Sequence, residues 1–517
     1  MNKGYMNGTF FSTAIRRFHT VAPLVLIFIS IIAVQSVKAQ TLSLEECRQM
    51  AISNNKQLSA SRMKQEVADN AKEIARTQYL PKVQAIGSYL HTSKDISLLN
   101  GDQKSMLNNL GTSSLGIATE ALPGMMQDLL AAGLLSPEQA QGLQQLVGKY
   151  GPAFAEALNK AGNEVTDAFN TKTRNIWAGS VMVTQPLYMG GRITALNKIA
   201  DINRELVANQ SDNMEQEVLI NTERAYWLVV SLKQKQKLAT DFRDLLKKLH
   251  SDVEKMVVEG VATKADELSV SVKVNEADMT LTQVDNGLAL ARMALCQICG
   301  LPIKSEITLA DEGNQALSTN IDGQALVGRH NLAIENRPEI KMLANAADIA
   351  REGIKLVKAD YKPTLALTGG YIISNPNVFD GFQRKFSGVW NVGVMFSLPI
   401  WNWGETKYKV RAAKAATNIA EMQLADAKEM IELQVSQNEF KLDEAQKRVD
   451  MTRKNIKSAD ENLRAATLGF KEGVMTTSNV LEAQTAWLKA QTQKIDAEVD
   501  LKVATAEMKK SLGIIKY

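Results

Sequence analysis

The chain has 517 residues, with 60 Lys and Arg, 56 Asp and Glu, 11 Pro and only 3 Cys. Residues 1–39 hold four of the basic residues and no acidic one, which leaves 56 basic (60 less 4) against 56 acidic residues. A chain this close to neutral has no basic domain for nucleic acid, and three cysteines do not form a disulfide framework.

Residues 1–39 have the pattern of a secretory signal peptide. Arg16 and Arg17 precede an apolar run of 14 residues, Val21–Val34, and Val37-Lys38-Ala39 is an acceptable cleavage site. The run is shorter than the roughly 20 residues of a membrane-spanning helix, so a signal is favoured over an anchor. No later stretch is apolar enough to span as a helix, so entry into a membrane would require strands.

The first elements after the signal are a helix and a strand. Apolar spacing predicts a helix over Leu42–Arg76 that ends before Pro81, with a kink at Asn54-Asn55. Residues 83–91 then alternate as a strand does. The candidate buried positions of the helix are Leu44, Cys47, Ala51 and Leu58.

Residues 92–175 differ in composition and are rich in Gly, Leu, Asn, Gln and Ser. They form either a small helical insertion or a long loop that contains helices. The helical fragments are expected near Leu122–Leu130, Pro137–Lys149 and Ala153–Phe169.

A second strand, Trp177–Gln185, leads through Q-P-L-Y-M-G-G-R into a helix from about Ile193 to Glu259, roughly 100 Å long. A turn at Gly260 separates it from a second helix, Lys264–Cys299, which Gly300-Leu301-Pro302 ends. Cys296 and Cys299 form C-x-x-C at a helix end in apolar surroundings, so core positions are favoured over a redox motif.

The same landmarks recur later in the chain and predict a twofold internal repeat. Q-P-L-Y-M-G-G-R returns as L-P-I-W-N-W-G-E, and E-G-V-A-T returns as E-G-V-M-T, both at a shift of 213 residues. Ala51–Leu58 matches Ala333–Ile340 at a shift of 282. We therefore expect a first repeat over 40–302, a linker over 303–323 and a second repeat over 324–517.

The predicted strands alternate between an apolar face and a polar or small face, as membrane β-barrels do. Four of the six tryptophans lie at strand ends, where interfacial aromatic girdles occur. Four strands per chain cannot close a barrel, so the barrel must be shared between chains. The predicted lipid-facing residues are Trp177, Val181, Val183, Trp390, Val392, Val394 and Phe396.

With its repeat, its strand-Pro-aromatic-Gly-helix junctions at 186–191 and 399–404 and its E-G-V-x-T turns, the chain resembles the TolC-like outer-membrane efflux family. The resemblance covers residues 42–517 outside the insertion. It implies a mixed α/β membrane protein of the outer membrane of a Gram-negative bacterium, forming a homotrimer with a twelve-stranded barrel. A coiled-coil helical tunnel would cross the periplasm to an adaptor protein and an inner-membrane pump of the resistance-nodulation-division or ABC type.

The resemblance also assigns site residues. The turns that would contact the adaptor are Gly260-Val261-Ala262-Thr263 and Gly473-Val474-Met475-Thr476. Just past the second turn the family carries acidic residues that narrow the tunnel, and the matching positions here are Asn479 and Glu482. Glu482 keeps the charge and Asn479 departs from it. The alternative interpretation is that Thr263 and Thr476 only cap the helices that follow, and that Glu482 only belongs to a solvated helix face.

No catalytic motif, phosphate loop or paired metal ligands occur, so neither an enzyme nor a cofactor or metal is expected. The favoured function is passive export through a trimeric duct, with drugs, metal ions or polypeptides as open substrate classes. The alternative is a secreted coiled-coil scaffold, or a periplasmic adaptor without a pore.

Overall fold

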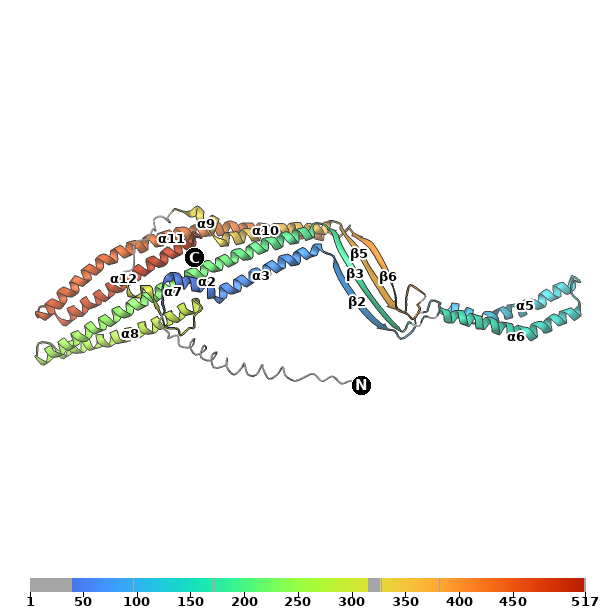
Figure 1. Ribbon diagram of the computed structural model, residues 1–517, viewed down its shortest axis with the longest axis horizontal. Coiled ribbons are helices and arrows are strands. Elements are labelled where there is room, and N and C mark those ends of the chain that lie inside the picture. The colour runs from blue at the N-terminus through green and yellow to red at the C-terminus, as the bar shows by residue number, and fades with distance from the viewer. Residues whose placement is uncertain are drawn as a thin grey trace, which may run out of the picture. The chain divides into compact units, whose positions relative to one another are not determined.

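A computed structural model describes residues 40–515, apart from residues 96, 170, 172, 315–325, 327 and 381. The predicted signal peptide and part of the predicted linker lie outside the described residues. The described chain forms two compact units (Figure 1). The helical unit comprises residues up to Lys72, Ile199–Arg351 and the chain from Lys414 onward. The sheet unit comprises Glu73–Lys198 and Glu352–Ala413.

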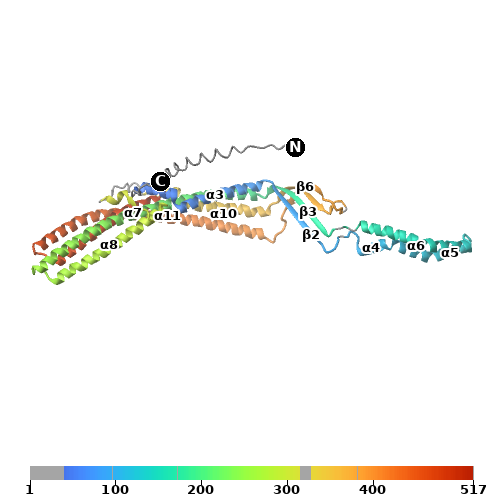
Figure 2. The ribbon, with the colours of Figure 1, turned by 60° about the horizontal axis from the view of Figure 1, so that its bottom comes forward.

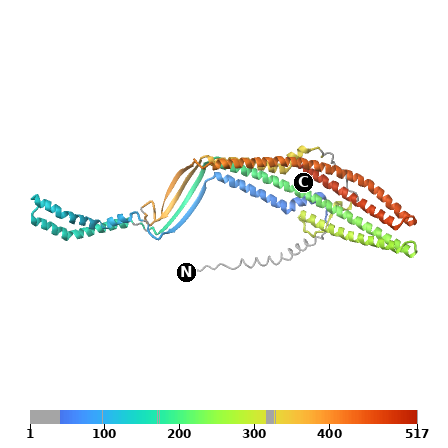
Figure 3. The same cartoon turned by 180° about the vertical axis from the view of Figure 1, so that it is seen from behind.

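Long helices make up most of the helical unit, and several of them continue into the sheet unit. In Figures 1 and 3 the helices α7 and α8 form one hairpin and α11 and α12 another, with both turns at the same end of the unit. The helices are α2 (Leu44–Asn54), α3 (Lys56–Arg76), α7 (Arg192–Val258), α8 (Lys264–Ile298), α9 (His330–Asn336), α10 (Pro338–Lys358), α11 (Glu405–Lys471) and α12 (Thr477–Ser511).

The kink predicted at Asn54-Asn55 is confirmed as a break between α2 and α3. The backbone N–H of Asn55 bonds to the Ala51 carbonyl and ends α2. Its side-chain oxygen accepts from the N–H groups of Gln57, at 2.9 Å, and Leu58, at 3.2 Å. One asparagine therefore closes one helix and caps the next, which bends the chain without leaving these groups unpaired.

Two hydrophobic clusters hold the base of the helical hairpins. The first joins α2, α7 and α8 and contains Cys47, Cys296 and Cys299, all fully buried, as predicted for core residues. The second joins α9 to α12 around Val435, Val449, Leu501, Met508 and Leu512. The two clusters bury the apolar faces of both halves of the chain.

Glycines that follow α8 and α12 pack tightly against the chain of an earlier helix. Gly300 has φ +72°, and a Cβ there would lie 2.5 Å from the Cβ of Asn54. Gly513 has φ +69°, and a Cβ there would lie 3.0 Å from the Cβ of Asn336. Positive φ and lack of space both require glycine.

The segment expected as a linker contains regular structure. Strand β4 (Ile307–Leu309) pairs in parallel with β1 (Gln40–Leu42), and the 3₁₀ turn η2 (Ala310–Gly313) follows. Tyr226 of α7 donates its hydroxyl to Asp311 at 2.7 Å, which ties this segment to the long helix. This strand could not be predicted, because three residues are too few positions to show alternation.

The sheet unit contains one antiparallel sheet in the order β2-β3-β5-β6. Its strands are β2 (Lys82–His91), β3 (Asn175–Met189), β5 (Thr364–Asn375) and β6 (Ser387–Ser397), and the 3₁₀ turns η1 (Thr77–Tyr79) and η4 (Ala359–Tyr361) precede β2 and β5. Each chain thus has two edge strands, β2 and β6. Every residue of β2 is exposed.

The predicted end of β3 at Gln185 is wrong, because the strand continues through Pro186 to Met189. The pairing with β5 shifts register between Pro186 and Tyr188. Proline cannot donate to a sheet ladder and is tolerated where a bulge interrupts the ladder. In the second half, β6 ends at Ser397, before Pro399.

The insertion between β2 and β3 is helical, which settles the choice between a helical insertion and a loop. It consists of α4 (Gly101–Asn108), α5 (Leu110–Ala131) and α6 (Pro137–Ala168). Figure 2 shows α5 and α6 side by side. The two fragments predicted on either side of Pro152 are one continuous helix, because Gly151, next to this proline, and Ala155 pack against α5.

Close packing joins the insertion helices to one another. A Cβ at Gly111 would lie 2.0 Å from the carbonyl oxygen of Ala155, so the backbones are in direct contact. The Asn159 side chain of α6 accepts from the N–H groups of Gly111, at 2.7 Å, and Thr112, at 3.1 Å. It therefore caps α5 from the neighbouring helix.

Candidate functional site

The turn between α7 and α8 has the geometry of a glycine helix stop. Gly260 has φ +73°, a conformation that a side chain would strain. The Val261 N–H donates to the Met256 carbonyl at 2.8 Å. This bond, made just past a left-handed glycine, is a Schellman motif and satisfies a carbonyl at the helix end.

The turn between α11 and α12 repeats this geometry. Gly473 has φ +72°, and the Val474 N–H donates to the Gly469 carbonyl at 2.8 Å. Val474 is 80% exposed and Val261 is 69% exposed, so each turn presents an apolar side chain to solvent. Each turn therefore offers a contact surface, beyond its role in reversing the chain.

The helices that follow the turns are capped by threonine, with different partners. The Thr263 side chain accepts from the Asp266 N–H at 3.2 Å, and the Asp266 carboxylate accepts from the Thr263 N–H at 3.0 Å, which completes a capping box. Hydrogen bonds from the hydroxyl and the N–H of Thr263 lower the pKa of Asp266. The Thr476 side chain accepts from the Asn479 N–H at 3.4 Å, and the two side chains are hydrogen-bonded to each other.

A small hydrophobic cluster joins the two hairpins close to the turns. It brings together residues of all four long helices, so the turns are held by a shared core. Its buried members are Leu249, Val253, Val270, Phe470 and Val480, with Met256, Val257, Ala262, Val274 and Leu481 packed against them.

The two residues assigned to a tunnel constriction lie on the exposed side of α12. Asn479 and Glu482 are three positions apart and therefore share a face of the helix. Val480 and Ala483, each one position further along, lie about 100° around the helix from them and are buried. The structure thus places both candidate residues on one exposed face, close to the second turn.

The seven predicted lipid-facing residues lie on one face of the sheet. Cross-strand register places Val181 beside Tyr371 and Tyr371 beside Trp390. Tyr89 pairs with Trp177, and their ring centroids are 4.5 Å apart. The residues of this face in β6 are more than half exposed, at 74% for Trp390, 70% for Val392, 63% for Val394 and 63% for Phe396.

The opposite face of the sheet is mixed. It carries small and polar residues such as Ser180, Thr184 and Asn391, which cross-strand register places on one side. It also carries Ile86 and Met395, both 55% exposed. The polar face is therefore less uniform than simple alternation predicts.

Aromatic residues are concentrated where β6 gives way to α11. Trp401 and Trp403 are 75% and 87% exposed, and their rings meet edge to face at 5.8 Å. Trp403 has φ +52°, which is unusual for a residue other than glycine. Exposed tryptophans at the end of an apolar sheet face are typical of a membrane interface.

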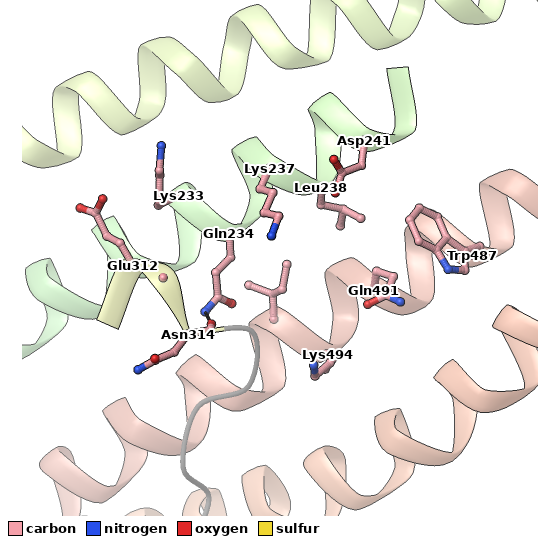
Figure 4. A pocket seen from close by; sticks show the side chains of 12 residues that line it. Lys233, Gln234, Lys237, Leu238, Asp241, Glu312, Asn314, Trp487, Gln491 and Lys494 are labelled. Carbon is pink, nitrogen blue, oxygen red and sulfur yellow. Dashed lines mark hydrogen bonds between the residues drawn. The ribbon is translucent and has the colours of Figure 1, made fainter. Parts of the chain in front are cut away.

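A hollow of about 380 Å³ lies between α7, α12 and the segment after β4 (Figure 4). None of the residues that line it belongs to a motif predicted from the sequence. Lys233, Lys237 and Lys494 line it together with Asp241 and Glu312, and Glu312 is paired with Arg292 at 2.8 Å. Charges of both signs give the hollow no evident preference for an anion or a cation.

Two features are absent from the described residues. Within the described residues, no helix combines the length and apolarity of a membrane span. No cluster of His, Cys, Asp and Glu suited to a metal ion occurs in the part of the chain that the structure describes.

Residues 330–514 match the family model described as outer membrane efflux protein. The alkaline protease secretion protein AprF of Pseudomonas aeruginosa is 22% identical over 201 residues, which are 39% of this chain and 41% of AprF. The match thus spans less than half the length of this curated relative.

Solved structures are similar over most of the chain. The outer-membrane channel OprN has a TM-score of 0.68 and 14% identity, over 91% of this chain and 89% of that one. The outer membrane protein VceC of Vibrio cholerae has a TM-score of 0.66 and 13% identity, over 91% and 96%. At these identities the likeness shows the fold. Together with the family match, it confirms the resemblance to TolC-like outer-membrane efflux proteins.

Proposed function

We propose that this chain, a relative of the outer-membrane efflux proteins, forms the outer-membrane duct of a tripartite export system. The observation that carries the proposal is the sheet. It has four strands and an exposed apolar face in register across all of them, which a soluble sheet packed on a core would bury. Its two edges are unpaired. The function is passive passage, without catalysis.

The duct is a homotrimer with a twelve-stranded barrel. Four strands are too few to enclose a lumen, and three chains supply twelve. Because neighbouring strands in β2-β3-β5-β6 alternate in direction, β6 of one chain meets β2 of the next as another antiparallel pair. Closure of this kind removes both edges.

The helices form the wall of a periplasmic tunnel built from a twofold repeat. Equal lengths support the repeat, since α7 and α11 have 67 residues each, α8 and α12 have 35, and α3 and α10 have 21. The close approach of Gly300 to Asn54 has its counterpart in Gly513 and Asn336. We assign the first repeat to 40–302, the linker to 303–323 and the second repeat to 324–517.

The partners are a periplasmic adaptor, which grips the turns 260–263 and 473–476, and an inner-membrane pump. Exposed Val261 and Val474 give the adaptor apolar contacts at both turns. AprF is by its name a protease secretion protein, which supports polypeptides as one substrate class. Small molecules such as drugs or metal ions are the other.

Three copies of Glu482 would form a ring near the tunnel end, with Asn479 beside it. A ring of three carboxylates attracts cations and repels anions. Glu482→Ala should therefore reduce the cation preference of single channels, whereas assembly should be unchanged because this side chain is exposed. An unchanged preference would leave Glu482 as an ordinary exposed residue.

Purified, mature protein in planar bilayers tests the proposal directly. We expect a mass of three chains, a band that migrates as an oligomer until it is heated, and discrete conductance steps. A soluble monomer without conductance would favour the alternative, a secreted coiled-coil scaffold or a periplasmic adaptor without a pore.

A further inference from the structure

Helix α6 of the insertion has three distinct stripes. One faces α4 and α5 and contains the buried residues of the helix, Ala140, Ala155, Gly162 and Thr166. A second is charged and exposed, with Lys149, Glu156, Lys160 and Glu164. Between them runs a third, which we call the apolar stripe, and all its members are exposed. The apolar stripe consists of Leu143, Leu146, Tyr150, Phe154, Ala157, Ala161 and Val165.

The spacing of the apolar stripe is that of a helix-packing seam. Its members follow one another at intervals of three, four and four residues, so the pattern repeats every eleven positions. Phe154, Ala161 and Val165 each lie one position before a residue of the buried face, which places the stripe about 100° around the helix from that face. Phe154 is 66% exposed and Tyr150 is 56% exposed. A helix with two apolar seams packs on two sides, and the described part of the chain covers one of them with α4 and α5.

We infer that the second neighbour is the same hairpin in other copies of this chain, and that three α6 helices meet along their apolar stripes. The inference rests on the proposed trimer. The insertion leaves the sheet at His91 and returns at Asn175, which are paired neighbours in β2 and β3. Threefold symmetry therefore carries three insertions from the same end of the barrel, each presenting the same stripe.

The charges favour a second copy over a lipid surface. The charged stripe borders the apolar one and carries two lysines and two glutamates, so it offers charges of both signs to a neighbouring copy. Residues 101–168 contain three lysines and seven acidic residues. Helices that lie on anionic membranes carry an excess of basic residues beside their apolar face, and this insertion has the opposite balance.

A bundle of three hairpins would cover the mouth of the duct on the cell exterior. Passage through the duct then requires the hairpins to separate, or a route between their connections to the sheet. The insertion is thus assigned a role in closing the outer end, at the opposite end of the barrel from the adaptor.

Disulfide cross-linking of full-length trimers tests this interface. The native cysteines Cys47, Cys296 and Cys299 are buried, so an introduced surface thiol is the one that oxidant reaches. Phe154→Cys lies on the apolar stripe, and its matched control Glu156→Cys lies on the charged stripe two residues away. Under mild oxidation we expect Phe154→Cys to yield covalent dimers, in which two of the three thiols around the axis pair. Glu156→Cys should remain monomeric on denaturing gels.

The oligomer is measured first, before oxidation, and this separates the two proposals. Loss of the trimer in the unsubstituted chain would overturn the duct. Intact trimers in which Phe154→Cys forms no more dimer than Glu156→Cys would overturn the bundle alone. A Phe154→Cys thiol that is open to a water-soluble maleimide in purified trimers but protected on whole cells would also overturn it, in favour of a lipid or protein partner.

Deletion of residues 100–170 provides a second measurement that does not depend on cysteine geometry. We expect trimers to persist, because the sheet pairing lies outside the deleted segment. Single-channel conductance should rise, because the cover is gone. Unchanged conductance in intact trimers would contradict a bundle over the mouth.

Discussion

Three pairs of helices have the same length in the two halves of the chain, which differ at a few defined places. Both halves end their hairpins with a left-handed glycine at the same point of the turn, Gly260 and Gly473. They differ in the cap that follows, in the residue that joins strand to helix, and in the insertion that only the first half carries. The two halves thus share the residues that a strained backbone conformation requires. They differ in residues that face solvent or a partner.

The largest expected effect is at the second turn. Proline cannot adopt the φ of +72° at Gly473, so Gly473→Pro should distort the turn and abolish export. Val474→Asp should do the same while keeping the backbone, because it removes an exposed apolar contact. Trimers should persist, since the main clusters lie at the base of the hairpins. Export from cells and oligomer bands on unheated gels measure the two effects.

Substitutions in the first turn can be compared with those in the second. Gly260→Pro and Val261→Asp should be as damaging if the adaptor grips both turns, and milder if it grips one. Leu268→Asp, on an exposed face of α8, is the control for added charge near the tip. Full export by Gly473→Pro would remove the role proposed for the turns.

The next largest effect is expected from a charge placed on either face of the sheet. Val394→Arg, and its counterpart Val181→Arg in the first half, place a charge on the apolar face and should cost about 2–4 kcal/mol at mid-bilayer depth. Asn391→Arg and Ser397→Arg, on the other face, should be tolerated better. Unfolding in urea from lipid vesicles gives the values. Equal losses on both faces would contradict the assignment of one face to lipid.

Substitutions at the two strand-to-helix junctions should change the free energy of unfolding by different amounts. Gly190 has φ +64°, and a Cβ there would lie 2.7 Å from the Ala359 carbonyl oxygen, so Gly190→Ala should cost about 2 kcal/mol or more. Trp403→Gly should change stability little. It relieves a positive φ worth about 1 kcal/mol and loses an aromatic contact with Trp401 of similar size. Chemical denaturation of both variants beside the parent checks the difference.

The smallest effect is the acid response of the two caps. The pKa of Asp266 lies below its ordinary value of 3.8 because Thr263 donates to the carboxylate. The stabilisation is therefore complete above that ordinary value and is lost as the pH falls through the lowered one. Asn479 does not titrate, so the second cap should be indifferent to acid.

Stability measured between pH 6 and pH 3 in Asp266→Asn and Asn479→Asp checks this response. The first substitution should flatten the acid loss slightly, and the second should steepen it. An identical pH profile in both variants and the parent would show that neither cap contributes through its charge.

Most of the helical unit could be predicted from the sequence, because long helices repeat their apolar spacing many times. The bounds of α7 and α11, the break at Asn55 and the two turns follow from periodicity, glycine and capping residues. The predictions that were wrong concern features that depend on packing between segments. The continuity of α6 through Pro152 rests on contacts with α5, and β3 passes Pro186 by a register shift that only its partner β5 defines.

The same distinction applies to the residues of the candidate site. The turns and the apolar sheet face could be read from local pattern, since glycine and strict alternation each have a direct structural meaning. Asn479 was assigned from resemblance alone, and its hydrogen bond to Thr476 gives it a second, local role as part of a cap. The pocket between α7 and α12 was missed because its lysines converge from distant parts of the chain.

The unpaired edges of β2 and β6 have a consequence for genetics. In the proposed trimer each edge is completed only by a neighbouring chain, so a subunit with one damaged edge disrupts one junction and prevents the ring from closing. A cell that makes intact and edge-damaged chains in equal amounts would assemble roughly one ring in eight from intact chains alone. Lesions at these edges should therefore be dominant over the normal gene, whereas a chain unable to enter the ring at all should be recessive.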